Sequence, residues 1–377
     1  MEKIIFRKFL YDLISFFLIV SLSLSLIAWV IQSVNYLDFI SKDGHGFKVY
    51  FAIIALNFPK IFSKVIIFSY FISLFYVIQK YQLNNEILIF WTNGISRLKL
   101  TNFIIKISII FAIIQILFVY SIVPKTQDYS REFIRTSNMD LFTSLITEKK
   151  FIDTLKDFTL FVENIDEEGN MKNIFLKDSL DKINTQIVTA RSGKIIENGS
   201  KKFLSLNFGQ ILDITNNNPN ESKIIKFNST NFNISNFKTK STIFPKFQEL
   251  NSSILISCVN NFLFGNKETY FLPIFSCSKE SSIKSAKEIF NRSIKQLYLI
   301  VVGIMASILI FSNERKPKFI MNKIIIFSIG ILCIIISEVN SELINLSLQS
   351  NILFISLPFI IFFMGYIAIL NFNNKKF

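Results

Sequence analysis

Six long apolar runs dominate this chain and limit what it can fold into. They lie at about residues 13–34, 49–79, 103–123, 297–312, 320–337 and 352–371. At a rise of about 1.5 Å per residue, a helix needs about 20 residues to cross a hydrocarbon core of about 30 Å. Most runs are long enough, and the short fourth run is expected to begin before residue 297. With 51% hydrophobic residues and 43 Phe, the chain is too apolar for an ordinary soluble domain. The pattern predicts a membrane α-helical bundle of six transmembrane helices.

The positive charges indicate how this bundle is oriented. Basic residues gather at both ends of the chain, between the second and third runs and after the fourth: Lys3, Arg7, Lys8, Lys80, Arg97, Lys99, Arg315, Lys316, Lys318, Lys323, Lys375 and Lys376. All of these clusters fall on one side if the six runs are spans, whereas the 338–350 loop has acids and no base. Because cytoplasmic loops carry the excess of Lys and Arg, both termini are expected in the cytoplasm. The first run lacks a persuasive cleavage site, so we expect it to be retained.

The polar interval at 124–296 is then expected outside the cytoplasm. Its alternating stretches predict strands at about 158–165, 173–178, 186–191, 194–198, 203–207, 210–215 and 224–234. Turn signals occur at Glu168-Gly169-Asn170, Ser192-Gly193, Asn198-Gly199 and Asn216 to Asn220. This spacing is typical of an antiparallel sandwich or jelly roll, with helical flanks at 130–146 and 281–298.

The predicted organisation therefore has three parts. Residues 1–123 hold transmembrane helices one to three, 124–296 form an inserted extracytoplasmic all-β jelly-roll domain with flanking helices, and 297–377 hold helices four to six. Inside the second run, Pro59 predicts a kink.

The sequence lacks the common signatures of catalysis and of nucleic-acid binding. It contains no phosphate loop, no HExxH, no CxxC pair and no GxSxG, and His45 is its single histidine. The net charge of +14 is spread along the chain without a basic stripe interleaved with aromatics, which argues against nucleic acid. Cys258 and Cys277 are close enough in sequence for a disulfide if both face an oxidising compartment, and Cys333 lies inside an apolar run. We expect no enzyme, no metal and no cofactor in this chain, and any work against a gradient must be driven by another chain.

Two lysines inside the second run form the first candidate site. Lys60 and Lys64 lie four residues apart, on one helical face and far from either end of the run. Charges within a membrane span usually face a cavity or a partner, so these lysines are candidates for holding an anionic lipid headgroup. Gln32, Asn35 and Lys42, near the outer end of the first span, could extend the same polar rim. The alternative is that the helix projects from the bilayer and the side chains snorkel to its interface.

A short amphipathic segment between the second and third runs forms the second candidate site. In a continuous helix over residues 84–98, apolar side chains gather on one side while Glu86, Asn93 and Arg97 fall together on the other. This arrangement assumes that the helix runs through Gly94. One interpretation is a plain interfacial helix with a solvated polar face. The other is a docking helix that presents Glu86 to a cytoplasmic protein.

Several segments, taken in order, resemble one family. NNEILIFWTNGISRL at 84–98 resembles the DSEL-x-AMRA-x-G-x-S-x-x-RL segment of the LptF/LptG lipopolysaccharide export permeases. FTLFVENIDEEGNMKNIFLKD at 158–178, TARSGKI at 189–195 and EIFNRSIKQLY at 288–298 are similar to the family's strand-turn-strand, its TAE-x-G-x-L and its helix before span four. WVIQSVNYLDFISKDGHG at 29–46 looks like the LptF version rather than LptG. The matches extend from about residue 7 to 312.

The resemblance implies a function that the patterns alone do not. Members pair as LptF and LptG on an LptB ATPase dimer, which supplies ATP and magnesium chemistry, in the bacterial inner membrane. They take lipopolysaccharide from the outer leaflet and pass it through periplasmic jelly rolls to LptC- and LptA-like proteins. In this family the Glu that matches Glu86 lies in the coupling helix that docks onto LptB, and Gly94 matches that helix's glycine.

Two departures from the family pattern stand out. Trp91 replaces a usual Arg, which puts a polar contact there in doubt. Gln296 replaces a common Pro, so we expect a straighter approach to span four. The competing interpretation is a membrane sensor or envelope-assembly scaffold whose β domain binds a ligand without transport.

Overall fold

The computed structural model describes most of the chain. The described residues are 2–37, 47–136, 146, 148–152, 158–166, 168–179, 184–198, 201–215, 222–233, 246–264, 270–272, 275–312, 319–345 and 348–374. The chain divides into two compact units. The first, called here the membrane unit, comprises Met1–Ile31, Asn57–Asp128 and Lys246–Phe377. The second, the β unit, comprises Gln32–Leu56 and Tyr129–Pro245.

Helices account for the apolar runs. They are α1 (Glu2–Asn35), α3 (Phe47–Leu83), α4 (Ile87–Thr92), α5 (Arg97–Leu117), the π-helix η1 (Phe118–Ile122), α6 (Val123–Thr136), α8 (Ser252–Phe264), α9 (Lys279–Arg292), the 3₁₀ turn η4 (Ile294–Leu297), α10 (Tyr298–Ser307), the 3₁₀ turn η5 (Ile308–Phe311), α11 (Phe319–Leu343) and α12 (Leu348–Asn374). Six helical segments in the described chain are long and apolar enough to cross a membrane, which confirms the predicted bundle. The fourth, Lys279–Phe311, begins before residue 297 as expected. Pro59 lies inside α3, which continues past it to Leu83.

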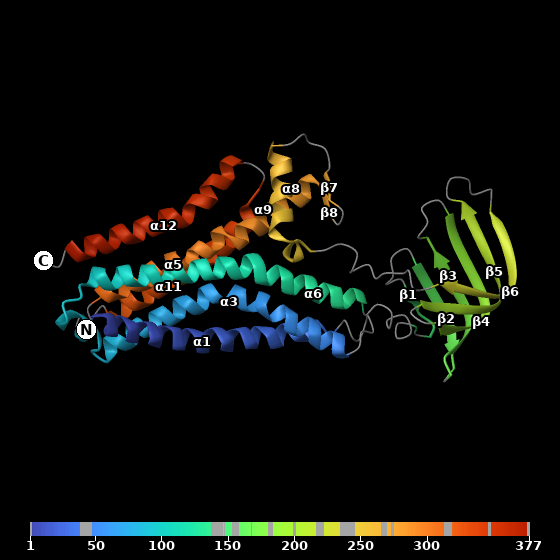
Figure 1. Cartoon of the computed structure of the whole chain (residues 1–377), viewed down its shortest axis with the longest axis horizontal. Helices are drawn as coiled ribbons and strands as arrows, with labels where there is room; N and C mark the ends of the chain where they lie inside the picture. Colours follow the sequence, from blue (N-terminus) through green and yellow to red (C-terminus); the bar gives the residue numbers. More distant parts are fainter. Residues whose placement is uncertain are drawn as a thin grey trace. The chain divides into compact units, whose positions relative to one another are not determined.

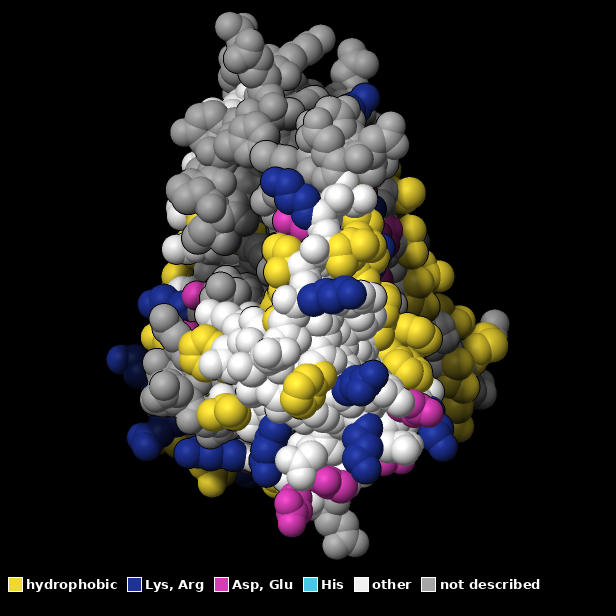
Figure 2. Space-filling view, turned by 90° about the vertical axis from the view of Figure 1, so that its right-hand side faces the viewer, with side chains coloured by type: hydrophobic (Ala, Val, Ile, Leu, Met, Phe, Trp, Pro, Cys, Tyr) yellow, Lys and Arg dark blue, Asp and Glu magenta, His cyan; other side chains and the backbone are white. Residues whose placement is uncertain are grey.

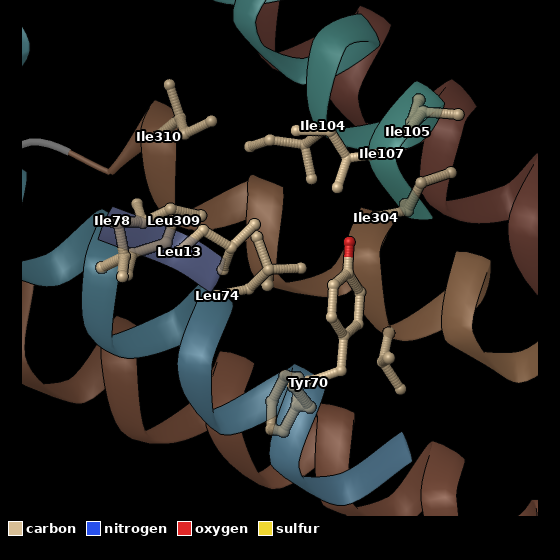
Figure 3. Close-up of a cluster of buried hydrophobic side chains, with 14 of the residues drawn as sticks. Leu13, Tyr70, Leu74, Ile78, Ile104, Ile105, Ile107, Ile304, Leu309 and Ile310 are labelled. Carbon is tan, nitrogen blue, oxygen red and sulfur yellow. The ribbon is translucent and has the colours of Figure 1, made fainter. Parts of the chain in front are cut away.

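The core of the membrane unit forms where α10 packs against its neighbours. α10 contacts α5, α11 and α12. Tyr70 of α3, Ile104 of α5 and Ile304 of α10 are each 0% exposed and lie close together in Figure 3. The Tyr70 and Ser108 hydroxyls share a buried hydrogen bond of 2.8 Å. This bond satisfies two polar groups that have no water to pair with at this depth.

The β unit contains one antiparallel sheet. Its strands are β1 (Phe151–Ile152), β2 (Phe158–Ile165), β3 (Asn170–Asp178), β4 (Asn184–Asn198), β5 (Lys201–Thr215) and β6 (Lys223–Asn233). Each strand pairs with the next in sequence, in the order β1-β2-β3-β4-β5-β6 (Figure 1). The predicted all-β insertion is therefore confirmed, and its described strands form a meander. Among the described strands, there is none of the longer connections between non-neighbouring strands that a jelly roll has.

The alternation of side chains explains the core of this sheet. Leu160, Leu176 and Val188 are neighbours in register and are at most 1% exposed. Phe161 and Phe175, next along their strands, form the neighbouring cross-strand pair and face the other side. The buried face thus contains the aliphatic side chains predicted from the period-two pattern.

Two predicted strand breaks are wrong. Ser192-Gly193 lies within β4, and the gap expected between 203–207 and 210–215 lies within β5. Gly193 is needed for packing rather than for a turn, because a Cβ there would lie 2.7 Å from Ile174 Cδ1 and 2.8 Å from Ser205 O. The predicted turn at Glu168-Gly169-Asn170 is confirmed, with the Gly169 amide donating to Asp166 O at 2.9 Å. Hydrogen bonds from Asn170 lower the pKa of the Asp166 carboxyl. Gly199 and residues 216–220 lie outside the described residues.

A covalently closed helical hairpin follows the β unit. Cys258 of α8 and Cys277 of β8 (Phe275–Cys277) form a disulfide, with Cα atoms 5.8 Å apart. β8 pairs with β7 (Tyr270–Leu272), and α8 packs against α9. The Cys258–Cys277 disulfide, which the sequence allowed but did not decide, is therefore present in this structure.

The approach to the fourth span contains a short 3₁₀ turn, and the straighter entry expected from Gln296 stays a prediction. η4 interrupts the helix between α9 and α10, and Gln296 lies in it. The Gln296 amide donates from Nε2 to Asn291 O at 2.7 Å. Gln296 therefore caps a carbonyl freed by the interruption.

Candidate functional site

The segment between α3 and α5 is two short elements rather than one helix. α4 covers only Ile87–Thr92, and α5 begins at Arg97. The predicted continuous helix over 84–98 is therefore wrong. It ends because Gly94 adopts a φ of 76°, a left-handed conformation that favours glycine. The amide of Ile95 donates to Phe90 O at 2.9 Å and that of Gly94 to Trp91 O at 3.1 Å, the two bonds of a Schellman motif.

Burial of Phe90 fixes α4 to the bundle. Its side chain is 1% exposed, and its ring centroid lies 6.2 Å from that of Phe6, 6.3 Å from Phe9 and 6.0 Å from Tyr81. Ile95, across the Schellman motif, is also 1% exposed. The three aromatic partners lie on α1 and α3, so Phe90 packs α4 against both helices. The sequence prediction missed Phe90, because a continuous helix places it off the apolar face.

Glu86 lies immediately before α4 and is partly covered. Its carboxylate is 3.6 Å from Lys8 Nζ, and its side chain is 24% exposed. Asn84 Nδ2 donates to its Oε1 at 3.1 Å. It makes no capping hydrogen bond to α4. Glu86 is therefore held by one base and one amide at the margin of the bundle, with part of the carboxylate open to a partner.

The other predicted members of this site do not share a face with Glu86 in one helix. Asn93 donates from Nδ2 to Ile89 O at 2.7 Å and so serves as a local cap. Arg97 lies on α5, with its guanidinium carbon 5.7 Å from the Trp91 ring centroid. This cation–π contact gives Trp91 a physical role that the sequence did not suggest.

The outer surface of α4 is apolar. Leu88 is 51% exposed and Ile89 is 48% exposed, and Leu83 at the end of α3 is 58% exposed. Exposed apolar side chains beside a partly open carboxylate suit a protein groove better than bulk water.

The second candidate site is a polar pocket of ≈ 220 Å³ within the membrane unit. Lys60 and Lys64 both line it, so the structure brings these two predicted residues together. Three carboxylates from α9 and α11 also line it: Glu288, Glu338 and Glu342. The sequence prediction missed these acids, which come from segments far from the lysines in the chain.

The acids of this pocket are already paired with other bases. Glu288 accepts from Arg292 at 2.9 Å, Glu338 lies 2.6 Å from Lys295, and Glu342 lies 3.0 Å from Lys287. Within the described chain, neither Lys60 nor Lys64 forms an ion pair. The two amines are thus without a direct ion pair among the described residues, with the carboxylates of Glu249 and Glu288 near enough to attract Lys60.

Buried acceptors also line this pocket. Asn291 Oδ1 and Gln296 Oε1 are buried and lack a hydrogen-bond partner among the described residues. A buried acceptor without a partner is unfavourable by about 1–3 kcal/mol. The pocket therefore offers two cations and two acceptors to a bound polar group.

The remaining predicted rim residues lie elsewhere. Gln32 and Asn35 are in the last turns of α1, in the β unit, whereas Lys60 and Lys64 belong to the membrane unit. Lys42 lies outside the described residues. The common rim that joins them to the lysines stays a prediction.

A comparison with known protein families relates this chain to one of them. Residues 7–371 match the family model described as lipopolysaccharide export system permease LptF/LptG. The chain belongs to the LptF/LptG family. The match covers all six candidate spans, the inserted sheet and the α4 segment, so the resemblance seen in separate motifs extends over nearly the whole chain.

A curated relative of this LptF/LptG family member is an uncharacterized protein of Rickettsia prowazekii (strain Madrid E). It is 22% identical over 209 residues, which are 55% of this chain and 57% of the relative. The chain thus spans a little over half the length of the relative that it matches. The choice between LptF and LptG continues to rest on residues 29–46 and stays a prediction.

Proposed function

We propose that this chain is the permease subunit of an ATP-driven lipopolysaccharide exporter. In this proposal it extracts lipopolysaccharide from the inner membrane and passes it to a periplasmic bridge. The α4 segment supports the proposal most directly, since it combines Glu86, an exposed apolar surface and a buried aromatic anchor. Family membership supplies the substrate class.

The energy would come from a separate LptB-like ATPase dimer that holds ATP and magnesium. This chain would form a heterodimer with an LptG-like paralogue and would carry no catalytic residues itself. Leu88 and Ile89 would enter a groove of the ATPase, with Glu86 against a donor at its rim. Because Phe90 contacts α1 and α3 through ring packing, closure of the ATPase would shift both helices together.

Lys60 and Lys64 would hold the anionic headgroup during extraction. Their lack of ion pairs among the described residues and the unpaired acceptors beside them support this role. A phosphate would pair with the amines, and a headgroup hydroxyl would donate to Gln296 or Asn291.

The β unit would lie in the periplasm and receive the lipid. The Cys258–Cys277 disulfide supports an oxidising location for residues 246–292, because disulfides persist in the periplasm and are rare in the cytoplasm. β6 ends the described sheet, and Ile224 and Ile225 on it are 65% and 54% exposed. An open edge strand of this kind can pair with another β domain, which suits LptC- and LptA-like bridge proteins.

Association with the ATPase tests the coupling role. We expect an LptB-type ATPase to co-purify with the wild-type chain, and Glu86→Ala to reduce its recovery about tenfold or more, in line with loss of a charge-assisted bond. Glu280→Gln is the matched control, since Glu280 pairs only with Lys284 on its own helix among the described residues. Equal recovery with Glu86→Ala and wild type would exclude Glu86 as a docking residue.

A further inference from the structure

The strands of the β unit share one line of interrupted pairing. Between β2 and β3 the register passes from Val162↔Ile174 to Asn164↔Lys172 and skips one residue on each strand. The same omission occurs between β3 and β4, between β4 and β5, and between β5 and β6. The skipped residues form a row across five strands, called here the crease: Glu163, Asn173, Arg191, Phe208 and Asn228.

The backbone is left-handed at two crease positions. Asn173 has a φ of 49° and Phe208 a φ of 54°. Asparagine adopts this region readily, whereas for a bulky aromatic residue it is a genuine outlier. Phe208 is nevertheless 64% exposed, so burial of its ring does not offset the strain. Strain without a packing reason is typical of a residue that is kept for a functional contact.

The crease opens into a groove on the outer face of the sheet. The groove has a volume of ≈ 750 Å³ and includes the rings of Phe161, Phe175 and Phe208. Phe151 extends this aromatic surface, with its ring centroid 4.8 Å from that of Phe161. The buried aliphatic core lies on the opposite face of the same strands. The rings of Phe161 and Phe175 thus point away from that core, although Ile174 and Ala190 of the core also contribute to the lining of the groove.

The charged side chains that line the groove are basic, and the acidic Glu163 of the crease lies beside it and accepts a hydrogen bond from Asn173 Nδ2. Arg191 and Lys226 line the groove, and its described lining contains no Asp or Glu. Asn173, Gln210 and Asn228 add amides that can donate and accept hydrogen bonds. Within the described residues, neither base forms an ion pair. Figure 2 shows a face of the molecule on which basic side chains lie among hydrophobic ones, with acidic side chains mainly near its lower edge.

We propose that the groove binds an anionic saccharide, namely the phosphorylated sugar portion of lipopolysaccharide. Aromatic faces cover the apolar faces of sugar rings, amides bind hydroxyl groups, and the two bases bind phosphate. An acyl chain would leave the bases and amides without partners, and a peptide strand pairs with the edge of a sheet rather than with its face. The inference rests on the proposed function, because that function supplies lipopolysaccharide as cargo.

Binding of a lipid-free probe tests the groove. The probe is a phosphorylated oligosaccharide released from lipopolysaccharide by mild acid, titrated calorimetrically into the full-length protein in detergent. We expect saturable binding, at least about tenfold weaker after phosphatase treatment of the probe. Equal affinity for the treated probe would overturn the anionic part of the proposal. Displacement by a fatty acid would identify an acyl site and overturn it entirely.

Three variants localise the binding. Arg191→Gln combined with Lys226→Gln is expected to weaken binding about tenfold or more. Phe208→Asn removes the ring but tolerates the left-handed backbone, so a similar loss would reflect the ring and not misfolding. Lys223→Gln is the matched control, because Lys223 lies on the same strand, is exposed and does not line the groove. Wild-type affinity in both groove variants, with unchanged circular dichroism, would exclude the site.

The outcomes separate this inference from the proposed function. Saccharide binding that depends on Arg191 and Lys226, in a protein that fails to recover an ATPase, would support the groove and contradict the exporter. Recovery of the ATPase together with undiminished saccharide binding in the groove variants would support the exporter and contradict the groove.

Discussion

At the scale of single residues, Gly94 decides the shape of the candidate docking segment. Its φ of 76° ends α4 and turns Ile95 back into the core. Replacement by Val forces a β-branched side chain into the left-handed region and should destabilise the segment by about 1–2 kcal/mol or more. Asn tolerates that region and should be nearly neutral.

We therefore predict that Gly94→Val lowers recovery of the LptB-type ATPase, whereas Gly94→Asn retains it. The measurement is co-purification of the two variants at equal expression. Normal recovery with Gly94→Val would mean that the Schellman turn is not required for docking.

The lysines of the polar pocket give a second prediction at this scale. Lys60→Glu or Lys64→Glu places a carboxylate beside Glu288, Glu338 and Glu342. Repulsion of an anionic headgroup should reduce photo-crosslinking to lipopolysaccharide several-fold. Lys125→Glu serves as a control, since Lys125 is exposed and lies outside the described pocket lining. Unchanged crosslinking in both pocket variants would favour interface snorkelling.

At the scale of elements, the α8–α9 hairpin depends on its disulfide. The bridge joins residues 19 apart, and closing a loop of this length stabilises the folded state by about 3 kcal/mol in the chain-entropy model. We predict that Cys258→Ser lowers the melting temperature of the purified protein, and that reductant does the same to wild type but not to the variant.

Thiol labelling checks the same element independently. In non-reduced, denatured protein only Cys333 should react with maleimide, because it is the free cysteine. Three labelled cysteines in protein purified without reductant would contradict the bridge.

Elements also show where sequence patterns succeed and where they fail. Hydrophobic periodicity predicts the spans and most strands, because one buried face dictates the residue types along each element. Gly193 and Gly94 each follow a polar residue, which is a turn signal in the sequence, but the two glycines have different roles. Gly193 lies inside β4 for close packing against Ile174, and Gly94 ends a helix. Only tertiary neighbours distinguish these two cases.

At the scale of the whole molecule, the site residues also show how far the sequence alone can predict the structure. Lys60 and Lys64 can be found from their position inside an apolar run. The pocket that they line cannot be found in this way, because Glu288 and Glu338 come from segments far away in the sequence. Likewise, the contacts of Phe90 with α1 and α3 arise from packing between separate helices. These contacts are therefore visible only in the folded chain.

ATP-dependent release of lipopolysaccharide from proteoliposomes tests the central claim most directly. The vesicles would contain this chain, its paralogue and the LptB-type ATPase, and transfer to a soluble periplasmic acceptor would be followed with time. The account predicts transfer that requires ATP and magnesium, survives Glu280→Gln, and falls at least about tenfold with Glu86→Ala. Transfer that proceeds equally without ATP, or unchanged with Glu86→Ala, would contradict it.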